Sequence, residues 1–484
     1  MSIKIIKLFN MQIRLFFSII LSTILLQSCT FNNGSKTENT LQTSDSVSQK
    51  ENFITGQIIN KVVNLNDASQ NYSLYLPKAY SKKSSWPVIF IFDAHGDGNL
   101  PITKYKDLAE EYGFILAGSN NSKNGTSWEE SQAIGLKLFS DVESRLSINN
   151  QRIYALGFSG GARIANGLLL NNGSIAGVIC CGASAPAANS NIERSNYSFI
   201  GLVGNEDFNY TEMKKYDMVD LAGHNVKHSL ITFEGKHEWP SEKTMEEAFW
   251  WLTLNEMRKD IPKKNDALIA KHLEAINNQM QIIQQKKQTI DAYNLCIKTI
   301  NFYNGLSDLT YYFDIYKSIE KAPEIDKYKK QEEADWKQEE ELKQFYIKAI
   351  QTQDFTWWKK ELVSLNQKTK TEKNKNKVFI YKRTLSYLSL VAYMQASGAL
   401  KQNEINAADF FCKIYVLVDP TNSEAYYLTA SLDIKKGNTN DAINAFKNAI
   451  NNGFTDISRL QNDSAFIELK KNPEFLKLVE EIKK

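Results

Sequence analysis

The most constraining feature of this chain of 484 residues is a stretch, from about residue 53 to 258, in which short apolar runs alternate with helical patterns. The apolar runs are rich in β-branched residues and bounded by turn residues; they cover 88–92, 114–117, 153–156, 175–181, 198–203 and 229–233. Near-continuous apolar strands that alternate with helices indicate a mostly parallel sheet covered by helices on both faces. We therefore predict an α/β domain over 53–258.

The composition excludes several classes of protein. Lys plus Arg number 58 against 55 Asp plus Glu, a net charge of +3, without the basic excess typical of a nucleic-acid binder. The five cysteines are too few and too scattered for a disulfide scaffold, and no CxxC pair or His/Cys cluster indicates a zinc site. We predict neither a metal nor a cofactor, and we expect the adjacent Cys180 and Cys181 to be buried apolar residues of a strand.

The first 28 residues have the pattern of a secretory signal. Three basic residues precede an apolar run of twelve residues, 15–26. This run is too short to span a bilayer, because a membrane-spanning helix needs ~20 apolar residues. The run ends in Leu26-Gln27-Ser28-Cys29, which resembles a bacterial lipobox and implies lipidation of Cys29. The alternative is an ordinary signal peptide with a chance cysteine.

Two features follow from that signal. The residue after Cys29 is Thr30 rather than Asp, which by the usual sorting rule for such lipoproteins favours the outer membrane. Residues 29–52 are rich in Ser, Thr and Asn and poor in apolar residues, so they predict a flexible tether between the lipid and the first domain.

One motif in the α/β domain carries chemistry: Gly157-Phe158-Ser159-Gly160-Gly161, between the predicted strand 153–156 and the predicted helix 162–170. This is the context of a G-x-S-x-G nucleophile elbow, in which the serine occupies a strained turn and the glycines let strand and helix approach each other. We predict that Ser159 is a nucleophile. The alternative is a Gly/Ser-rich turn without chemistry.

A nucleophilic serine needs a base, and where the serine stands in a nucleophile elbow of this kind, the histidine follows both the serine and the acid along the chain. His237 follows the predicted strand 229–233 at its carboxyl end, where such sheets build their sites. His224 and His228 flank the other end of that strand, and His272 lies beyond the domain. Position therefore favours His237 as the base.

The acid should lie in the loop after the preceding strand, residues 204–210. Asp207 is the first choice and Glu206 the second. Either carboxylate could instead cap a helix that is predicted to begin near Thr211.

An attacked carbonyl also needs donors for the oxyanion. The backbone N–H of Gly160, directly after the nucleophile, is one candidate, and the N–H of Asp97, in the loop after the predicted strand 88–92, is the other. The side chain of Asp97 would then have to point away from a site that holds negative charge. His95 in the same loop is expected to be structural.

Together these residues resemble the α/β-hydrolase superfamily, and within it the esterase branch that includes polyhydroxybutyrate depolymerase-like, feruloyl, acetyl-xylan and dienelactone-hydrolase-like proteins. The resemblance covers roughly 53–258 and is carried by His95-Gly96, Ser119-Asn120-Asn121 with Trp128, Gly157–Gly161, Asp207–Tyr210 and His237–Pro240. It implies a carboxylic ester hydrolase with a Ser-His-Asp triad. Together with the exported location, it implies ester-substituted glycans or related esters as substrates.

After the hydrolase-like domain the strand signals largely stop, and 259–385 is predicted to be helical. Residues 317–341 are dense in charges of both signs and are interpreted as a solvated helix face. Residues 368–377, KTKTEKNKNK, are basic and free of apolar residues, so we interpret them as a linker loop.

Residues 386–484 contain a repeat. Tyr393 and Tyr427, Ala396 and Ala430, and Ala408 and Ala442 are each 34 residues apart, the period of tetratricopeptide repeats, in which small residues let paired helices approach. Residues 464–484 are predicted to form a capping helix. The resemblance implies a protein partner; the alternative is a set of generic helical hairpins.

The sequence thus favours a membrane-anchored serine esterase with a helical-repeat extension. The rival hypothesis is a non-enzymatic scaffold or docking lipoprotein that keeps a relic of a hydrolase fold. A relic should have lost at least one of the three catalytic residue types, whereas Ser159, Asp207 and His237 are all present and in order.

Overall fold

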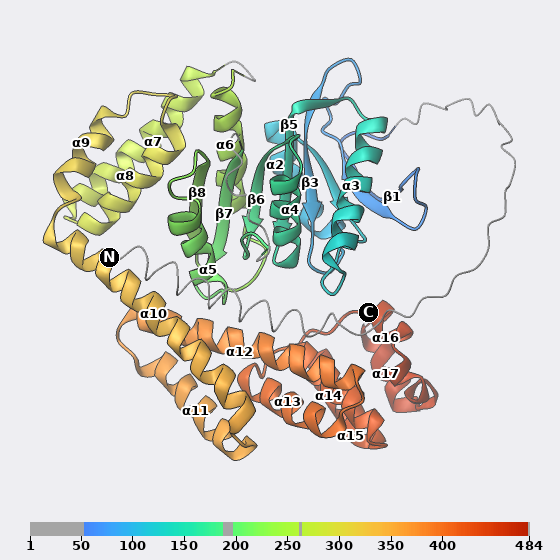
Figure 1. The fold of residues 1–484 in the computed structure, drawn as a ribbon. Coiled ribbons are helices and arrows are strands. Elements are labelled where there is room, and N and C mark those ends of the chain that lie inside the picture. The colour runs from blue at the N-terminus through green and yellow to red at the C-terminus, as the bar shows by residue number, and fades with distance from the viewer. Residues whose placement is uncertain (1–52, 187–196, 261–263, 483–484) are drawn as a thin grey trace, which may run out of the picture. The chain divides into compact units, whose positions relative to one another are not determined.

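The computed structural model describes residues 53–186, 197–260 and 264–482 (Figure 1). The signal peptide, the tether and the lipidation site Cys29 lie outside the described residues. The chain divides into two compact units. The first runs up to Leu202 and includes Glu212–Ile231 and Trp239–Asn265; the second comprises Val203–Thr211, Thr232–Glu238 and the chain from Asp266.

The described residues form an eight-stranded sheet with the order β1-β2-β4-β3-β5-β6-β7-β8. Strands β4, β3, β5, β6 and β7 pair in parallel, whereas β2 pairs antiparallel with both β1 and β4. The strands are β1 (Ile58–Val63), β2 (Asn71–Tyr75), β3 (Trp86–Phe92), β4 (Ile115–Ser119), β5 (Ile148–Phe158), β6 (Ile175–Cys181), β7 (Ser198–Gly204) and β8 (Lys227–Phe233). This is an α/β-hydrolase fold, so the predicted fold class of the first domain is confirmed.

Helices cover both faces of this sheet. They are α2 (Asn99–Tyr112), α3 (Trp128–Arg145), α4 (Gly160–Asn171), α5 (Tyr210–Lys215), the π-helix η2 (Tyr216–Asp220) and α6 (Glu242–Met257). Phe90 of β3 stacks on Phe139 of α3, with ring centroids 4.0 Å apart, on the face where Figure 1 shows α3 and α4. Ile89, the residue before Phe90, points to the opposite face of the sheet. Its partner Tyr154 on β5 lies beside Phe114, which packs on Phe249 of α6.

The predicted strands all form, but two further strands escape the sequence pattern. β1 is largely exposed or half-buried and carries Asn60 and Lys61, and β2 begins with Asn71 and contains Ser73. Because of these polar residues, β1 and β2 lack the continuous apolar run that identifies the other strands. Cys180 and Cys181 are buried in β6, as predicted.

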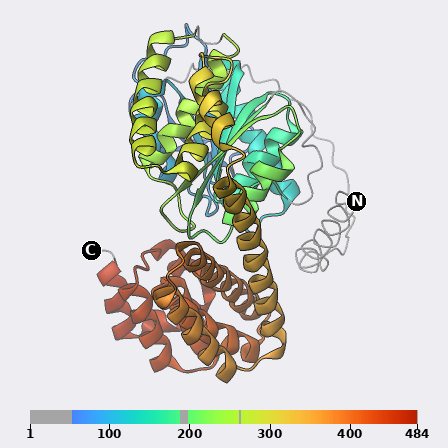
Figure 2. The same ribbon diagram turned by 90° about the vertical axis from the view of Figure 1, so that its left-hand side faces the viewer.

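The described residues from Asp266 to Ile482 are mostly helical, as expected, and Figure 2 shows the later helices, orange to red, stacked on one another. No helix among the described residues has both the length and the apolar character needed to cross a membrane. The helices are α7 (Asp266–Gln285), α8 (Thr289–Tyr303), α9 (Thr310–Ile319), α10 (Pro323–Thr352), α11 (Phe355–Thr371), α12 (Lys375–Lys401), α13 (Ile405–Val418), α14 (Ser423–Lys435), α15 (Thr439–Asn451), α16 (Ile457–Asn462) and α17 (Pro473–Ile482), with 3-10 turns at Ser464–Phe466 and Glu468–Lys471.

The prediction of a linker loop at 368–377 is wrong. Helix α11 continues to Thr371 and α12 begins at Lys375, so only three residues lie outside a helix. Lysine is a good helix former, and the side chain of Asn374 caps α12 by accepting hydrogen bonds from the N–H groups of Asn376 and Lys377.

The interpretation of 317–341 as a solvated face is wrong at two positions of α10. Asp335 and Glu339 are buried, and the side chain of Glu339 is 0% exposed. Asp335 accepts hydrogen bonds from Gln331 and Asn376. Glu339 forms ion pairs with Lys343 and Arg383. A charge pattern alone does not reveal partners so far along the chain.

The residues that suggested the 34-residue repeat lie in two helix pairs, α12 with α13 and α14 with α15, and all are buried except Tyr393, which is half-buried. Ala396, Ala408, Ala430 and Ala442 are each 0% exposed, so small side chains do stand where these helices pack. The assignment of these pairs to the tetratricopeptide family stays a prediction. The predicted capping helix is instead two 3-10 turns followed by α17, because Pro473 starts a new helix.

Candidate active site

Ser159 occupies the strained turn that the motif predicted, between β5 and α4. Its φ of 55° and ψ of −121° are a backbone conformation that residues other than glycine rarely adopt. Its N–H donates to the carbonyl of Cys181 at 2.9 Å, and its carbonyl accepts from the N–H of Ala162 at 3.0 Å. Such strain costs about 1–3 kcal/mol and persists only where the surrounding structure enforces it.

The glycines on either side of the serine are required by close backbone contacts. A Cβ on Gly157 would lie 2.2 Å from the carbonyl oxygen of Gly161, and a Cβ on Gly161 would lie 2.0 Å from that of Phe92. Strand, turn and helix can therefore meet only without these side chains. The spacing of the G-x-S-x-G motif follows from this packing.

Asp207 and His237 lie in direct contact, in the loops that follow β7 and β8. Both carboxylate oxygens of Asp207 lie 2.9 Å from Nδ1 of His237. The Asp207 side chain is 1% exposed and the His237 side chain 17% exposed. The contact orients the imidazole through Nδ1 and leaves Nε2 as the nitrogen that would exchange a proton with a substrate or a nucleophile.

The loop of Asp207 is also fixed locally. Oδ1 of Asp207 accepts from the N–H of Asn209 at 2.8 Å, so the alternative role as a turn cap coexists with the histidine contact. The ring of Phe208 lies 4.2 Å from that of His237. Glu206, the second choice for the acid, pairs instead with Lys382 at 2.6 Å. Of the two predicted acids, the structure brings Asp207 to the histidine.

The loop after β3 holds the predicted oxyanion residue Asp97. Its side chain accepts hydrogen bonds from the N–H groups of Asn99 and Leu100, both at 3.1 Å, and so turns toward the start of α2. The other predicted donor, Gly160, is the first residue of α4, where N–H groups have no partner within the helix and the helix dipole favours negative charge.

Asp93, the first residue after β3, stabilises this loop through hydrogen bonds. Its carboxylate, 1% exposed, accepts from the N–H of His95 at 2.7 Å and from the indole N–H of Trp239 at 2.9 Å. Burial alone would raise the pKa of Asp93, but the hydrogen bonds from His95 and Trp239 outweigh burial and lower it. The side chain of His95 is 79% exposed.

Asn124 is a site residue that the sequence reasoning missed. A Cβ on Gly160 would lie only 1.8 Å from Oδ1 of Asn124, so this amide occupies the space beside the residue that follows the nucleophile. The N–H of Asn124 donates to the carbonyl of Ala94 at 2.8 Å, which ties its loop to the one that contains Asp97. No local signal marks Asn124, because it lies in a polar loop far along the chain from the motif.

The other histidines are placed differently. His228, near the amino end of β8, pairs through Nδ1 with Asp217 of η2 at 2.8 Å. His224 precedes β8, and His272 lies in α7.

Ser159 belongs to the first compact unit, and the pair of Asp207 and His237 to the second. Within the described ranges, no group of three His, Cys, Asp or Glu side chains could hold a metal ion.

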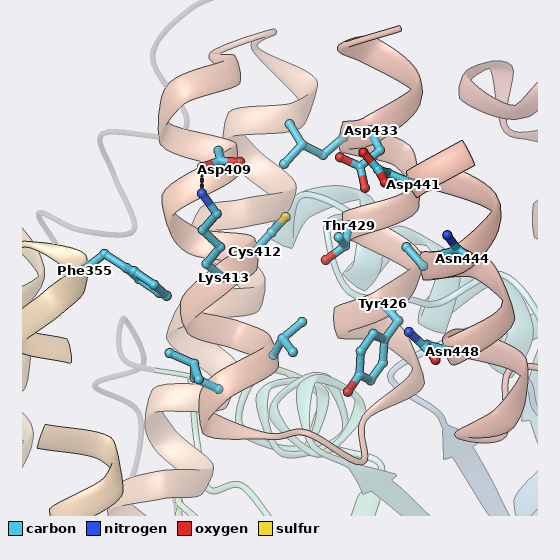
Figure 3. A pocket seen from close by; sticks show the side chains of 14 residues that line it. Phe355, Asp409, Cys412, Lys413, Tyr426, Thr429, Asp433, Asp441, Asn444 and Asn448 are labelled. Atoms are coloured by element: carbon cyan, nitrogen blue, oxygen red, sulfur yellow. Dashed lines mark hydrogen bonds and ion pairs between the residues drawn. The ribbon is translucent and has the colours of Figure 1, made fainter. Parts of the chain in front are cut away.

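The helical unit contains a pocket of about 490 Å³ between α13, α14 and α15, with Phe355 of α11 at one side (Figure 3). It contains none of the predicted catalytic residues. Its lining combines apolar side chains, two exposed amides and three carboxylates, namely Phe355, Cys412, Val416, Leu417, Leu432, Ala445, Asn444, Asn448, Asp409, Asp433 and Asp441, together with Lys413, Tyr426 and Thr429.

No protein-family model matches the chain, and no curated protein matches it. Among solved structures, the chain is similar to an S-formylglutathione hydrolase from Agrobacterium tumefaciens, at 13% identity over 40% of this chain and 93% of that one, with a TM-score of 0.34. It is similar to a ferulic acid esterase at 13% identity, over 41% and 98%, with a TM-score of 0.35. It is also similar to the feruloyl esterase module from Clostridium thermocellum at 15% identity, over 44% and 93%, with a TM-score of 0.31. The fold of this chain is established by its own strand order and pairing.

Proposed function

We propose that the protein is an esterase-type serine hydrolase in which Ser159 is the nucleophile, His237 the general base and Asp207 the acid that orients the imidazole. The observation that carries the proposal is the contact of both Asp207 oxygens with Nδ1 of His237 at 2.9 Å. The parallel pairing of β5, β6 and β7 supports it, because residues that follow parallel strands emerge at one edge of a sheet. The strained turn at Ser159 is a second support.

In the proposed reaction, Oγ of Ser159 attacks the ester carbonyl carbon while Nε2 of His237 takes the hydroxyl proton. The backbone N–H groups of Gly160 and Asp97 stabilise the oxyanion of the tetrahedral intermediate. The intermediate collapses, the bond to the alcohol breaks, and His237 returns the proton to the alcohol. Water, deprotonated by the same histidine, then attacks the acyl-enzyme, which releases the acid and restores Ser159.

The test is turnover of para-nitrophenyl acetate and labelling by a fluorophosphonate, with the full chain in detergent. Ser159→Ala should lose about 10³-fold or more of kcat and all labelling, because the residues of a triad act as a unit. The matched control is Ser85→Ala, an exposed serine outside the site, which should keep both. Equal labelling of wild type and Ser159→Ala would rule out Ser159 as the nucleophile.

For location and substrate class, we propose a lipid anchor at Cys29, an outer-membrane position and ester-substituted glycans as substrates. The support is the lipobox-like run that ends at Cys29 and the residue Thr30 after it. Cys29→Ser should shift the protein from the membrane fraction to the soluble fraction. A panel of acetylated and feruloylated glycans, assayed for released acid, tests the substrate class, and turnover of simple esters alone would refute it.

A second candidate function, binding of a protein segment by the helical unit, is favoured by the pocket between α13, α14 and α15 (Figure 3). Asp409 already pairs with Lys413 and Lys436, so Asp433 and Asp441 are the carboxylates of the lining that suit a cationic side chain of an extended peptide. Burial, together with repulsion from Asp441 and Asp409, outweighs the neighbouring lysines and raises the pKa of Asp433. A bound cation would relieve that repulsion.

This binding role is tested by fluorescence anisotropy with a lysine-rich peptide and its glutamate-substituted counterpart. The basic peptide should bind more tightly, and Asp441→Asn should weaken it about tenfold, whereas Glu474→Gln, an exposed acid outside the pocket, should not. Equal binding of both peptides would refute the pocket as a cation-selective site. If Ser159 also proves inert, a scaffold remains the better description of the protein.

A further inference from the structure

Side chains of helices α10 and α12 donate hydrogen bonds to the loop that carries Asp207, on both sides of that residue. The carbonyl of Asn205 accepts from Nη1 of Arg383 at 2.9 Å, and the carbonyl of Phe208 accepts from Nζ of Lys343 at 2.8 Å. Between them, the carboxylate of Glu206 pairs with Lys382 at 2.6 Å. All of these residues belong to the second compact unit. Cations of α10 and α12 thus bind the loop two residues before Asp207 and one residue after it.

The two cations that bind the carbonyls are themselves held by one buried carboxylate. Glu339 accepts from Nζ of Lys343 at 2.7 Å and from Nε of Arg383 at 2.8 Å. The side chains are 0%, 12% and 6% exposed for Glu339, Lys343 and Arg383. Burial alone would raise the pKa of Glu339, but the two cations outweigh burial and lower it. Arg383 also lies over the ring of Tyr210, 4.4 Å from its centroid.

Burying three charges is costly unless each has partners, and a plain contact between two helices is usually made by apolar residues. Here the donors of Arg383 and Lys343 are directed to two main-chain carbonyls of the acid loop. Hydrogen bonds to main-chain carbonyls hold a segment in place whatever side chains it carries. The network therefore fixes the path of the main chain around Asp207. Phe208, whose carbonyl Lys343 binds, is also the residue whose ring contacts His237.

We propose that Arg383 and Lys343 are positioning residues: through the loop 205–208 they hold Asp207 against His237, so α10 and α12 fix the geometry of the acid–histidine pair. The proposal rests on the proposed function for its effect on catalysis. In the triad, the acid keeps the imidazole in one tautomer and stabilises its cation. A displacement of about 1 Å at such a group can cost about 10²-fold in rate.

The chain offers a matched control for Arg383. Arg459 also pairs with a glutamate, Glu424, and lies over a tyrosine ring, Tyr427, at 4.1 Å. Its pairing therefore has the same chemistry, but Glu424 and Tyr427 both belong to α14 and not to the loop of Asp207. Loss of Arg459 should cost local stability without reaching the acid loop.

The first measurement is steady-state hydrolysis of para-nitrophenyl acetate by the full chain. Arg383→Met should lower kcat about 10–100-fold with little change in KM, and Arg383→Lys should recover part of the loss. The acidic limb of the kcat/KM profile should move to lower pH, because an imidazolium that loses its carboxylate is less stable. Arg459→Met should leave kcat and the pH profile as in wild type.

The second measurement is amide hydrogen exchange of residues 203–211, which does not depend on activity. Exchange should accelerate in Arg383→Met and not in Arg459→Met. Unchanged exchange and kcat in Arg383→Met, or equal losses in both variants, would overturn the proposal. If Arg383→Met does not fold, Lys343→Met is measured in its place with the same expectations.

The two proposals fail in different ways. If wild type neither turns over esters nor labels at Ser159, the proposed hydrolase function fails. The exchange rates then still decide whether the helical region holds the loop. If turnover is present and depends on Ser159 while Arg383→Met and Lys343→Met behave as wild type, only the positioning role fails.

Discussion

Two histidine–aspartate pairs stand near opposite ends of the same strand, β8. His228 and Asp217 lie near its amino end, at 2.8 Å, with side chains 24% and 17% exposed. His237 follows its carboxyl end and contacts Asp207, from the loop after β7, at 2.9 Å, with side chains 17% and 1% exposed. The chemical groups are the same, and so is the distance to within 0.1 Å. The distance alone therefore does not distinguish a catalytic pair from a structural one.

The differences lie in burial and in support. A carboxylate that is 1% exposed acts on its imidazole through a medium of lower polarity than one that is 17% exposed, so its field is stronger. Asp207 uses both oxygens and sits in a loop bound by Arg383 and Lys343, whereas Asp217 uses Oδ1 and sits within a π-helix. A strand's carboxyl end is also where parallel sheets place their sites. These features favour the pair of His237 for chemistry.

The largest expected effect comes from removing each histidine in turn. His237→Ala should lower kcat for para-nitrophenyl acetate about 10⁴–10⁶-fold, because no other group takes the serine proton. His228→Ala should leave kcat within about twofold of the wild-type value, as expected for a substitution outside the site. The measurement is steady-state kinetics of both variants side by side. Comparable losses in the two would erase the distinction between the pairs.

The next effect comes from the acids. Asp207→Asn should lower kcat about 10⁴-fold, since an amide at this position favours the wrong tautomer of His237. Asp217→Asn should change stability by about 1 kcal/mol or less and kcat hardly at all. Kinetics and thermal unfolding of both variants separate the two roles. A loss of activity in Asp217→Asn at unchanged stability would assign that pair a chemical role.

A smaller effect, on stability, comes from Glu339, which supports the loop of Asp207. Its pKa is lowered from an ordinary value of 4.5, so its ion pairs stabilise the fold above that pH and the stabilisation is lost as pH falls through the lowered pKa. Glu339→Gln should cost about 3 kcal/mol near neutral pH, because two buried cations lose their partner.

The measurement for Glu339 is the free energy of urea unfolding of wild type and variant across the acidic range. The difference between them should shrink as pH falls below the ordinary pKa of glutamate. Glu474→Gln, at an exposed position, is the control and should show no such dependence. A difference that is constant with pH would mean that the carboxylate of Glu339 is not the charged partner of Arg383 and Lys343.

Much of the first domain was predictable because its signals are local. The strands 175–181 and 198–203 are continuous apolar runs, and the elbow at Ser159 needs glycines within two residues of it. The order of strands along the chain was enough to choose His237 and the loop that contains both candidate acids. The contact between them agrees with that choice, and their catalytic role stays a proposal.

Other features were out of reach because they depend on partners remote in sequence. Asn124 lies beside Gly160 through the packing of two loops, and nothing near Asn124 in the chain records it. Glu339 belongs to a charged run that reads as solvated, yet Arg383, 44 residues later, allows it to be buried. The prediction for the basic run 368–377 was wrong for a different reason. Apolar patterning identifies a buried helix, and it does not identify an exposed one.

Sequence alone determined the apolar strands of the first domain and the order in which the serine, acid and histidine follow them, because strand patterning and glycine turns are properties of neighbouring residues. Only the tertiary structure decided which of two acids meets His237, which charges are buried and which helices bind the acid loop. Those outcomes depend on desolvation and pairing energies between groups far apart along the chain, which a local pattern does not encode.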